Sequence, residues 1–163
     1  MVIYVGSFSK ILSAGLRVGF VLAPDDIIQK MVVAKQGEDV HTAMLPQILA
    51  YKFMKEYDYA GHVQLIREVY LRKCTLMTDC MEQYTDGSMA FTRPDGGLFL
   101  WCELPPTITM LDYCKIAAAK GVAVVPGTAF LVDPGEPCNA IRLNFSTPSD
   151  EQIVKGIQIL GQI

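Results

Sequence analysis

The fold of this chain is decided by Gly6-Ser7-Phe8-Ser9-Lys10-Ile11-Leu12-Ser13-Ala14-Gly15-Leu16-Arg17-Val18-Gly19-Phe20. Residues 2–5, before this stretch, and residues 17–23, at its end, are mostly apolar, and Pro24 follows at once. Short apolar runs bounded by Gly, Ser and Pro are typical of buried strands. The sequence therefore predicts two neighbouring strands joined by a loop rich in Ser and Gly.

Four side chains of this stretch carry useful chemistry. If the first strand continues to Ser9, its two-residue period puts Ser7 and Ser9 on one face and Lys10 at the strand's end. Arg17 brings a planar guanidinium, which can bind a phosphate by two parallel hydrogen bonds. Such a set suits a cofactor with an aldehyde and a phosphate, because lysine forms a Schiff base while hydroxyls and guanidinium hold the dianion. The alternative is a solvated lysine beside an ordinary Ser-rich loop.

Hydrophobic spacing predicts the elements that follow. Between His62 and Tyr84 the apolar residues recur at three- and four-residue intervals, which is one face of a single long helix. Ser149 is expected to cap the last helix, with Gln152 reciprocating. Further helices are expected at residues 25–36, 42–55 and 110–120, and further strands at residues 90–93, 98–104, 122–125 and 140–145.

This order of elements, β-β-α-α-α-β-β-α-β-β-α, predicts an α/β protein. We expect residues 1–56 to be part of one domain, with two strands and linking helices. Residues 57–163 are expected to form a small α+β domain, in which helices cover a four-stranded sheet.

Arg142 is the second candidate for binding an anion. In the last predicted strand Ile141, Leu143 and Phe145 point one way, while Arg142 and Asn144 point the other. A guanidinium on the polar face of an apolar strand needs an anionic partner. That partner is either the α-carboxylate of a substrate or a nearby Asp or Glu in a salt bridge.

Composition narrows the class of protein. The 163 residues are 51% apolar, and the net charge of −3 provides no basic face for nucleic acid. The five cysteines contain no C-x-x-C pair and lie away from both histidines, so no metal site is predicted. Reduced, mostly buried thiols indicate a cytoplasmic protein. No apolar run approaches the ~20 residues of a membrane helix, and no basic signal-peptide start is present.

The opening stretch resembles the cofactor-lysine motif S-F-S-K-x6-R-x-G of class I/II aminotransferases, which are pyridoxal-phosphate-dependent enzymes of fold type I. Ser7, Phe8, Ser9, Lys10, Arg17 and Gly19 satisfy this motif in order. The resemblance is to the kynurenine/2-aminoadipate aminotransferase branch in particular, although Ala14 stands where that branch often has proline. Residues 94–101, 121–130 and 142–146 are similar to three further segments of the family, the last being the strand with its substrate arginine.

The resemblance implies a function. Lys10 would hold pyridoxal 5'-phosphate as a Schiff base, Ser7, Ser9 and Arg17 would anchor its phosphate, and Arg142 would bind the substrate carboxylate. The enzyme would transfer an amino group between an amino acid and a 2-oxo acid and act as a homodimer. The family assigns proton transfer to the lysine, so His41 and His62 are not expected to be bases.

The resemblance also places several cofactor contacts before the lysine. Only nine residues precede Lys10, so we expect the chain to be the C-terminal portion of a longer enzyme and to be inactive in isolation. Residues 1–56 would then be the remnant of the large cofactor domain. Two alternatives stay open: the aminotransferase-like effector-sensing domain of a GntR-type transcription regulator, and a non-catalytic assembly domain.

Overall fold

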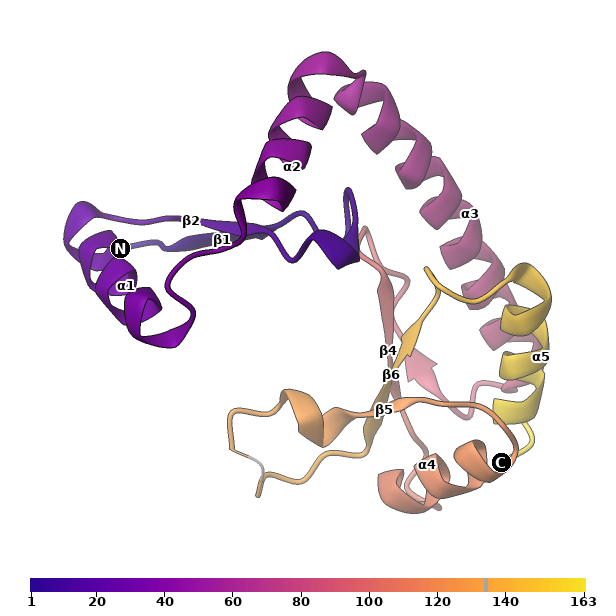
Figure 1. The fold of residues 1–163 in the computed structure, drawn as a ribbon. Helices are drawn as coiled ribbons and strands as arrows, with labels where there is room; N and C mark the ends of the chain where they lie inside the picture. Colours follow the sequence, from indigo (N-terminus) through magenta and orange to yellow (C-terminus); the bar gives the residue numbers. More distant parts are fainter. Residues whose placement is uncertain (134) are drawn as a thin grey trace. The chain divides into compact units, whose positions relative to one another are not determined.

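The computed structural model describes residues 1–133 and 135–163. Its helices and strands follow the predicted order, with two short 3₁₀ helices added (Figure 1). In chain order they are β1 (Tyr4–Ser7), η1 (Ala14–Leu16), β2 (Gly19–Leu22), α1 (Asp25–Glu38), α2 (Met44–Glu56), α3 (Tyr59–Tyr84), β3 (Ala90–Phe91), β4 (Phe99–Glu103), α4 (Met110–Ala119), β5 (Val125–Pro126), η2 (Gly127–Phe130), β6 (Ala140–Asn144) and α5 (Asp150–Leu160).

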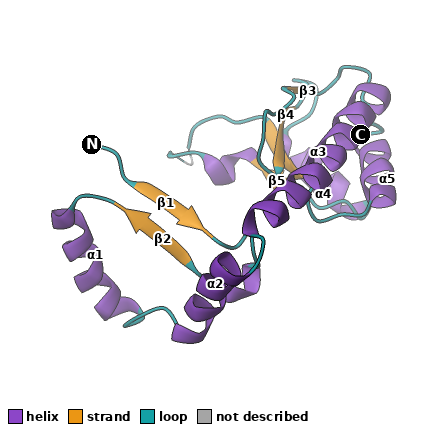
Figure 2. Ribbon diagram, turned by 90° about the horizontal axis from the view of Figure 1, so that it is seen from above, coloured by secondary structure: helices purple, strands orange, loops and turns teal. Residues whose placement is uncertain are grey.

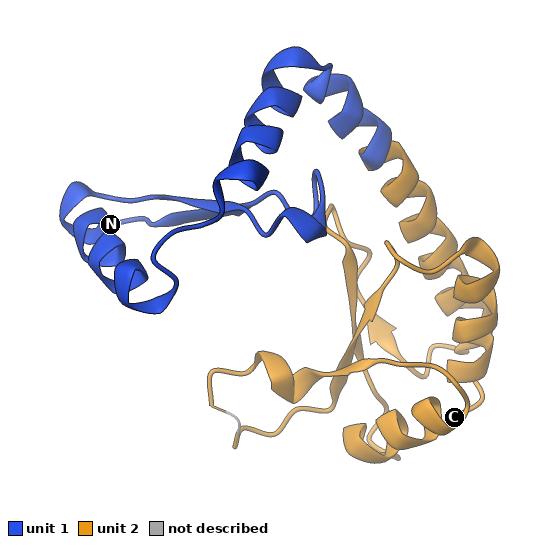
Figure 3. Ribbon diagram, viewed as in Figure 1, with its two compact units in different colours: residues 1–66 blue, residues 67–163 orange. Residues whose placement is uncertain are grey.

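The chain divides into two compact units, residues 1–66 and residues 67–163 (Figure 3). The division falls within the long helix α3, whose first turns belong to unit 1 and whose remainder belongs to unit 2. Each unit has its own sheet.

Unit 1 contains a two-stranded antiparallel ribbon, in which β1 and β2 pair from Tyr4 opposite Leu22 to Ser7 opposite Gly19 (Figure 2). The apolar composition predicted buried strands, and in this respect the prediction is wrong for the chain as it stands. Tyr4, Val5 and Leu22 are all exposed. In the described chain each strand has only the other as its sheet neighbour, and two strands cannot bury both of their faces.

Unit 2 contains a four-stranded sheet in the order β3-β4-β6-β5, with every neighbouring pair antiparallel. The predicted four-stranded sheet is therefore confirmed. A strand is expected at residues 122–125, but the observed strand β5 is only Val125–Pro126. Val122 is not part of it, because its N–H donates to the Ala117 carbonyl and completes the end of α4. Gly121 makes this helix end possible with its positive φ of 83°.

One face of this sheet forms the core. Leu100 pairs with Leu143 and Cys102 with Ile141, and all four side chains are buried. Helices α3, α4 and α5 lie on that side of the sheet (Figure 1) and contribute the rest of the cluster. The predicted apolar stripe on α3 is fully buried only near the C-terminal end of the helix, at Met77 and Met81.

The helix α5 begins as the sequence predicted. The Ser149 hydroxyl accepts a hydrogen bond from the Gln152 N–H at 3.3 Å, and the Gln152 side chain accepts one from the Ser149 N–H at 2.8 Å. This capping box satisfies N–H groups that an uncapped helix would leave without partners.

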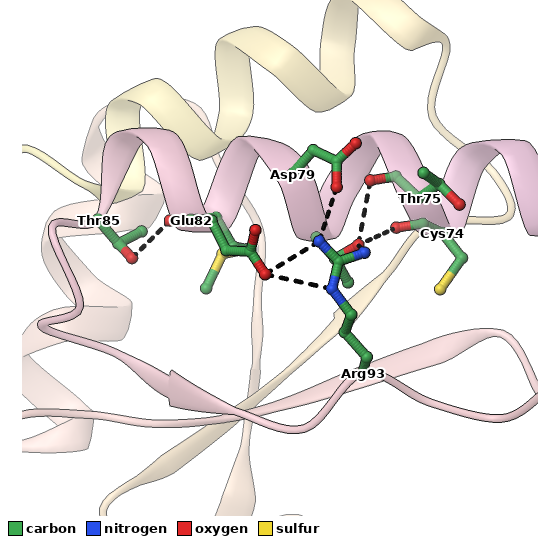
Figure 4. A network of polar contacts seen from close by, with 8 residues as sticks. Cys74, Thr75, Asp79, Glu82, Thr85 and Arg93 are labelled. Carbon is green, nitrogen blue, oxygen red and sulfur yellow. Dashed lines mark hydrogen bonds and ion pairs between the residues drawn. The ribbon is translucent and has the colours of Figure 1, made fainter.

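The segment between β3 and β4 is fastened to α3 by Arg93 (Figure 4). Its guanidinium donates to Asp79 at 2.7 Å, to Glu82 at 2.9 Å and to the Thr78 hydroxyl at 2.8 Å. The hydrogen bond to Asp79, and to a smaller extent that to Glu82, raises the pKa of Arg93 above its ordinary value. This network fixes the start of the turn that leads into β4.

Candidate functional site

The lysine loop of unit 1 begins where the β1–β2 ladder ends. The Phe8 N–H donates to the Val18 carbonyl at 3.0 Å, after which the chain turns away. The first strand therefore stops at Ser7 and does not reach Ser9 as predicted. Instead, the Ser9 N–H donates to the Ser7 hydroxyl at 3.1 Å, so a turn joins these two residues rather than the alternation of a strand.

Lys10 lies in this turn with its side chain exposed. In the described part of the chain no carboxylate forms an ion pair with Lys10 or with Arg17. Ile11, which follows Lys10, is bonded to the helix α3. The His62 ring on that helix donates a hydrogen bond through Nε2 to the Ile11 carbonyl at 2.8 Å. Sequence reasoning missed this anchor, since nothing local links two residues 51 positions apart.

Arg17 has a left-handed backbone conformation, with φ 54° and ψ 39°, directly after η1. A residue other than glycine pays a conformational cost there, and such residues are enriched at functional sites. One Nη of Arg17 donates to the Ala14 carbonyl at 3.2 Å. The guanidinium is therefore held at the edge of the lysine loop and keeps further donors for an anion.

Two glycines let the strands approach closely below the loop. A Cβ on Gly19 would lie 2.9 Å from the Gly6 carbonyl oxygen, and a Cβ on Gly6 would lie 2.3 Å from the Phe20 ring. Any side chain at Gly19 would push β2 away from β1. This contact gives a physical reason for the glycine that ends the cofactor-lysine motif.

Arg142 belongs to unit 2 and lies on the sheet face away from the core, opposite Trp101 in β4 and Val125 in β5. Its Cζ is 3.9 Å from the centre of the Phe99 ring and 4.4 Å from that of Phe130. Its Nε is buried without a hydrogen-bond partner, and no acidic side chain among the described residues pairs with it. The salt bridge left open as an alternative is therefore not formed within the described chain.

Two further groups with raised pKa values, Cys102 and Tyr113, lie in the core of unit 2. Burial raises the pKa of Cys102 to about 12 and also raises that of Tyr113, whose hydroxyl donates to the Leu160 carbonyl at 2.9 Å. All five cysteines are free. Among the described residues no cluster of three His, Cys, Asp or Glu could hold a metal ion. No helix of the described chain has the length and apolarity to cross a bilayer.

The structure thus places Ser7 at the end of β1, Ser9, Lys10 and Arg17 on the loop that follows it in unit 1, and Arg142 on the sheet of unit 2. The loop offers two hydroxyls, an amine and a guanidinium with no acidic partner among the described residues. This is a set of groups suited to an anion with a reactive carbonyl.

Comparison with known proteins identifies the family. The family described as aminotransferase class I and II matches residues 1–160. A 2-aminoadipate transaminase from Thermus thermophilus is 40% identical over 161 residues, which are 99% of this chain and 40% of that protein. An uncharacterized HTH-type transcriptional regulator from Bacillus subtilis is 32% identical over 98% of this chain and 33% of its own length.

A solved structure has the same fold. The α-aminoadipate aminotransferase of Thermus thermophilus, complexed with N-(5'-phosphopyridoxyl)-L-leucine, superposes with a TM-score of 0.91 at 39% identity. The match covers 98% of this chain and 41% of that one. The fold predicted from the sequence, that of the type I pyridoxal-phosphate enzymes, is confirmed, and the chain spans about 40% of the length of these relatives. The chain belongs to the aminotransferase class I and II family.

Proposed function

We propose that this chain forms part of a pyridoxal-phosphate-dependent aminotransferase that transfers an amino group between an amino acid and a 2-oxo acid. The observation that carries the proposal is the lysine loop, where Lys10 and Arg17 have no acidic partner among the described residues and two serines lie beside them. Residues 1–56 would belong to the large cofactor domain and residues 57–163 to the small domain.

The side chains present fit the cofactor. Its phosphate is a dianion that accepts hydrogen bonds, and Ser7, Ser9 and Arg17 supply donors. Its aldehyde requires a primary amine, and Lys10 is exposed on the same loop. When bound, pyridoxal phosphate supplies an electron sink for the carbanion that forms at the substrate Cα.

The chain's own residues then have separate roles. Arg142 binds the substrate carboxylate through the in-plane donors of its guanidinium and so orients the Cα. Lys10 Nζ, as a free amine, would remove the proton from that Cα and deliver it to the cofactor carbon. Ser7, Ser9 and Arg17 hold the phosphate in place while Lys10 moves.

We also propose that the enzyme is a cytoplasmic homodimer. The five free thiols favour a reducing compartment. The exposed apolar side chains of unit 1, among them Val5, Leu22 and Leu45, favour burial against further protein, as in a subunit interface.

Reduction with borohydride tests the role of Lys10. In the full-length holoenzyme we expect the reduced cofactor to be fixed on the peptide that contains Lys10, with 2-aminoadipate and kynurenine as the first amino donors to assay. Lys10→Ala should abolish both the label and turnover, whereas Lys30→Ala, an exposed lysine on α1, should change neither. A label on another lysine would refute the assignment.

The second candidate function is effector sensing in a transcription regulator, which the similarity to the Bacillus subtilis regulator favours. An assay of amino transfer distinguishes the enzyme from the regulator. A full-length protein that holds the cofactor on Lys10, binds DNA and shows no amino transfer would be a regulator.

A further inference from the structure

Three aromatic side chains surround Arg142 on the open face of the unit 2 sheet. Trp101 is its cross-strand partner, and Phe99 lies two residues earlier on the same face of β4. Phe130 comes from η2, directly after the edge strand β5, and contacts Trp101 edge-on with ring centres 5.9 Å apart. The rings come from two separate parts of the sequence, β4 and η2, and those of Phe99 and Phe130 lie over the same cation.

Neither phenylalanine is part of the hydrophobic core. The core cluster lies on the opposite face of the sheet and includes neither Phe99 nor Phe130. The side chain of Phe130 is 45% exposed. Burial of apolar surface therefore does not account for these rings, whereas both make close contact with the Arg142 guanidinium.

The contacts of Phe99 and Phe130 with Arg142 leave its N–H groups without hydrogen-bond acceptors from these rings. An aromatic ring attracts a cation over its face and has no in-plane acceptor for an N–H. The ring centres lie 3.9 Å and 4.4 Å from Cζ, distances at which a ring restricts rotation of the guanidinium. Nε meanwhile lies buried with its N–H unpaired, although a buried donor without an acceptor is destabilising.

We infer that Phe99 and Phe130 are positioning residues that hold the guanidinium of Arg142 so that its N–H edges, and not its faces, are presented to a carboxylate. A carboxylate that meets the guanidinium edge-on accepts two of its N–H groups together. The identity of that carboxylate as a substrate rests on the proposed function, but the aromatic contact itself does not.

The first test is independent of catalysis. In the 163-residue chain labelled with ¹⁵N-arginine, the Nε–H signal of Arg142 should be shifted upfield by the two rings, and Arg142→Lys identifies that signal. Phe99→Leu and Phe130→Leu should each move it back towards the other arginines. Phe91→Leu is the matched control, because Phe91 packs against the core cluster on the edge strand β3. An Arg142 signal unmoved by both phenylalanine variants would overturn the inference.

The second test uses kinetics of the full-length holoenzyme. Phe99→Leu and Phe130→Leu should each raise KM for the amino and the oxo substrate by about 3- to 10-fold, with kcat within about twofold. Phe130→Tyr, which keeps the ring, should restore KM. In an Arg142→Ala background, Phe130→Leu should add nothing, because a residue that acts through Arg142 has no effect without it.

The outcomes distinguish the two proposals. If Arg142→Ala raises KM about 10- to 100-fold while both phenylalanine variants leave it unchanged, the inference fails and the proposed function stands. If Arg142→Ala leaves KM unchanged for both substrates, no carboxylate binds there. The inference then fails with the substrate role of Arg142, and the lysine experiment still decides the reaction class.

Discussion

The two units of this chain contain similar apolar residues, but most of these side chains are exposed in unit 1, whereas in unit 2 many of them form a buried core. In residues 1–66, all of which are described, the buried apolar side chains are Val18 and Ala50. In residues 67–163 a continuous core includes side chains from three helices and two strands. The difference is one of neighbours, since the unit 2 sheet has four strands with helices on one face and the unit 1 ribbon has two.

This contrast indicates which unit holds the chain together. Core burial stabilises by roughly 25 cal/mol per Å² of apolar surface removed from water, so unit 2 supplies most of the stability. Unit 1 carries the lysine loop, but its exposed apolar residues form a surface suited to contact with other protein. The candidate cofactor residues thus lie in the less stable unit.

The largest expected effect is on function. The 163-residue chain by itself should show no transaminase activity and should lose pyridoxal phosphate on dialysis, because Lys10 lies exposed on a loop of the poorly buried unit. Limited proteolysis should cleave within residues 1–66 first. Stoichiometric cofactor after dialysis, together with turnover above that of free cofactor, would show that unit 1 is sufficient.

Matched leucine substitutions compare the stability of the two units. Leu100 in β4 is 1% exposed, and Leu100→Ala should destabilise unit 2 by about 2–5 kcal/mol through lost burial and a cavity. Leu22 in β2 is 62% exposed, and Leu22→Ala should change stability by less than about 0.5 kcal/mol. Urea unfolding followed by circular dichroism, which reports the helices of both units, measures both effects. Equal effects would mean that Leu22 is buried as well as Leu100 is and would contradict the contrast between the two units.

Alkaline pH should weaken unit 2 through its buried thiol. The pKa of Cys102 is about 12 in the folded chain, against an ordinary value of 9.0. Below pH 9 both states keep the proton, and between pH 9 and 12 only the unfolded state loses it. Stability should therefore fall by up to about 1.4 kcal/mol for each pH unit above 9.

The control for this pH effect is Cys102→Ala. Its slope of stability between about pH 9 and pH 10 should be shallower than that of the parent chain, measured by urea unfolding at each pH. An identical slope would assign the alkaline loss to other groups, of which Tyr113 is the first to test because burial raises its pKa too.

The smallest effect compares two serines at helix starts. Ser149 caps α5 through its side chain, and Ser149→Ala should cost about 1 kcal/mol. Ser13 precedes η1 without a side-chain cap hydrogen bond, so Ser13→Ala should be close to neutral. Thermal unfolding of both variants measures the difference, and a loss from Ser13→Ala as large as that from Ser149→Ala would contradict the role of the cap.

Much of the fold followed from local patterns. The three- and four-residue spacing predicted α3, the Ser149 and Gln152 pair predicted the start of α5, and the alternation around Arg142 predicted the two faces of β6. The strand lengths were less accurate. The Phe8 carbonyl accepts from the Leu12 and Ser13 N–H groups in the turn that ends β1, and the Val122 N–H completes the end of α4. Such bonds depend on partners that residue type alone does not reveal.

The sequence by itself determined the order of elements and the family, because periodicity and motif spacing are local properties of the chain. It also singled out Ser7, Ser9, Lys10, Arg17 and Arg142 as candidate site residues, and their roles stay predictions. Only the tertiary structure decided that His62 holds the lysine loop and that Phe99 and Phe130 contact Arg142. These contacts join residues that are distant in the chain, and they exist because strand pairing and helix packing bring those residues into reach.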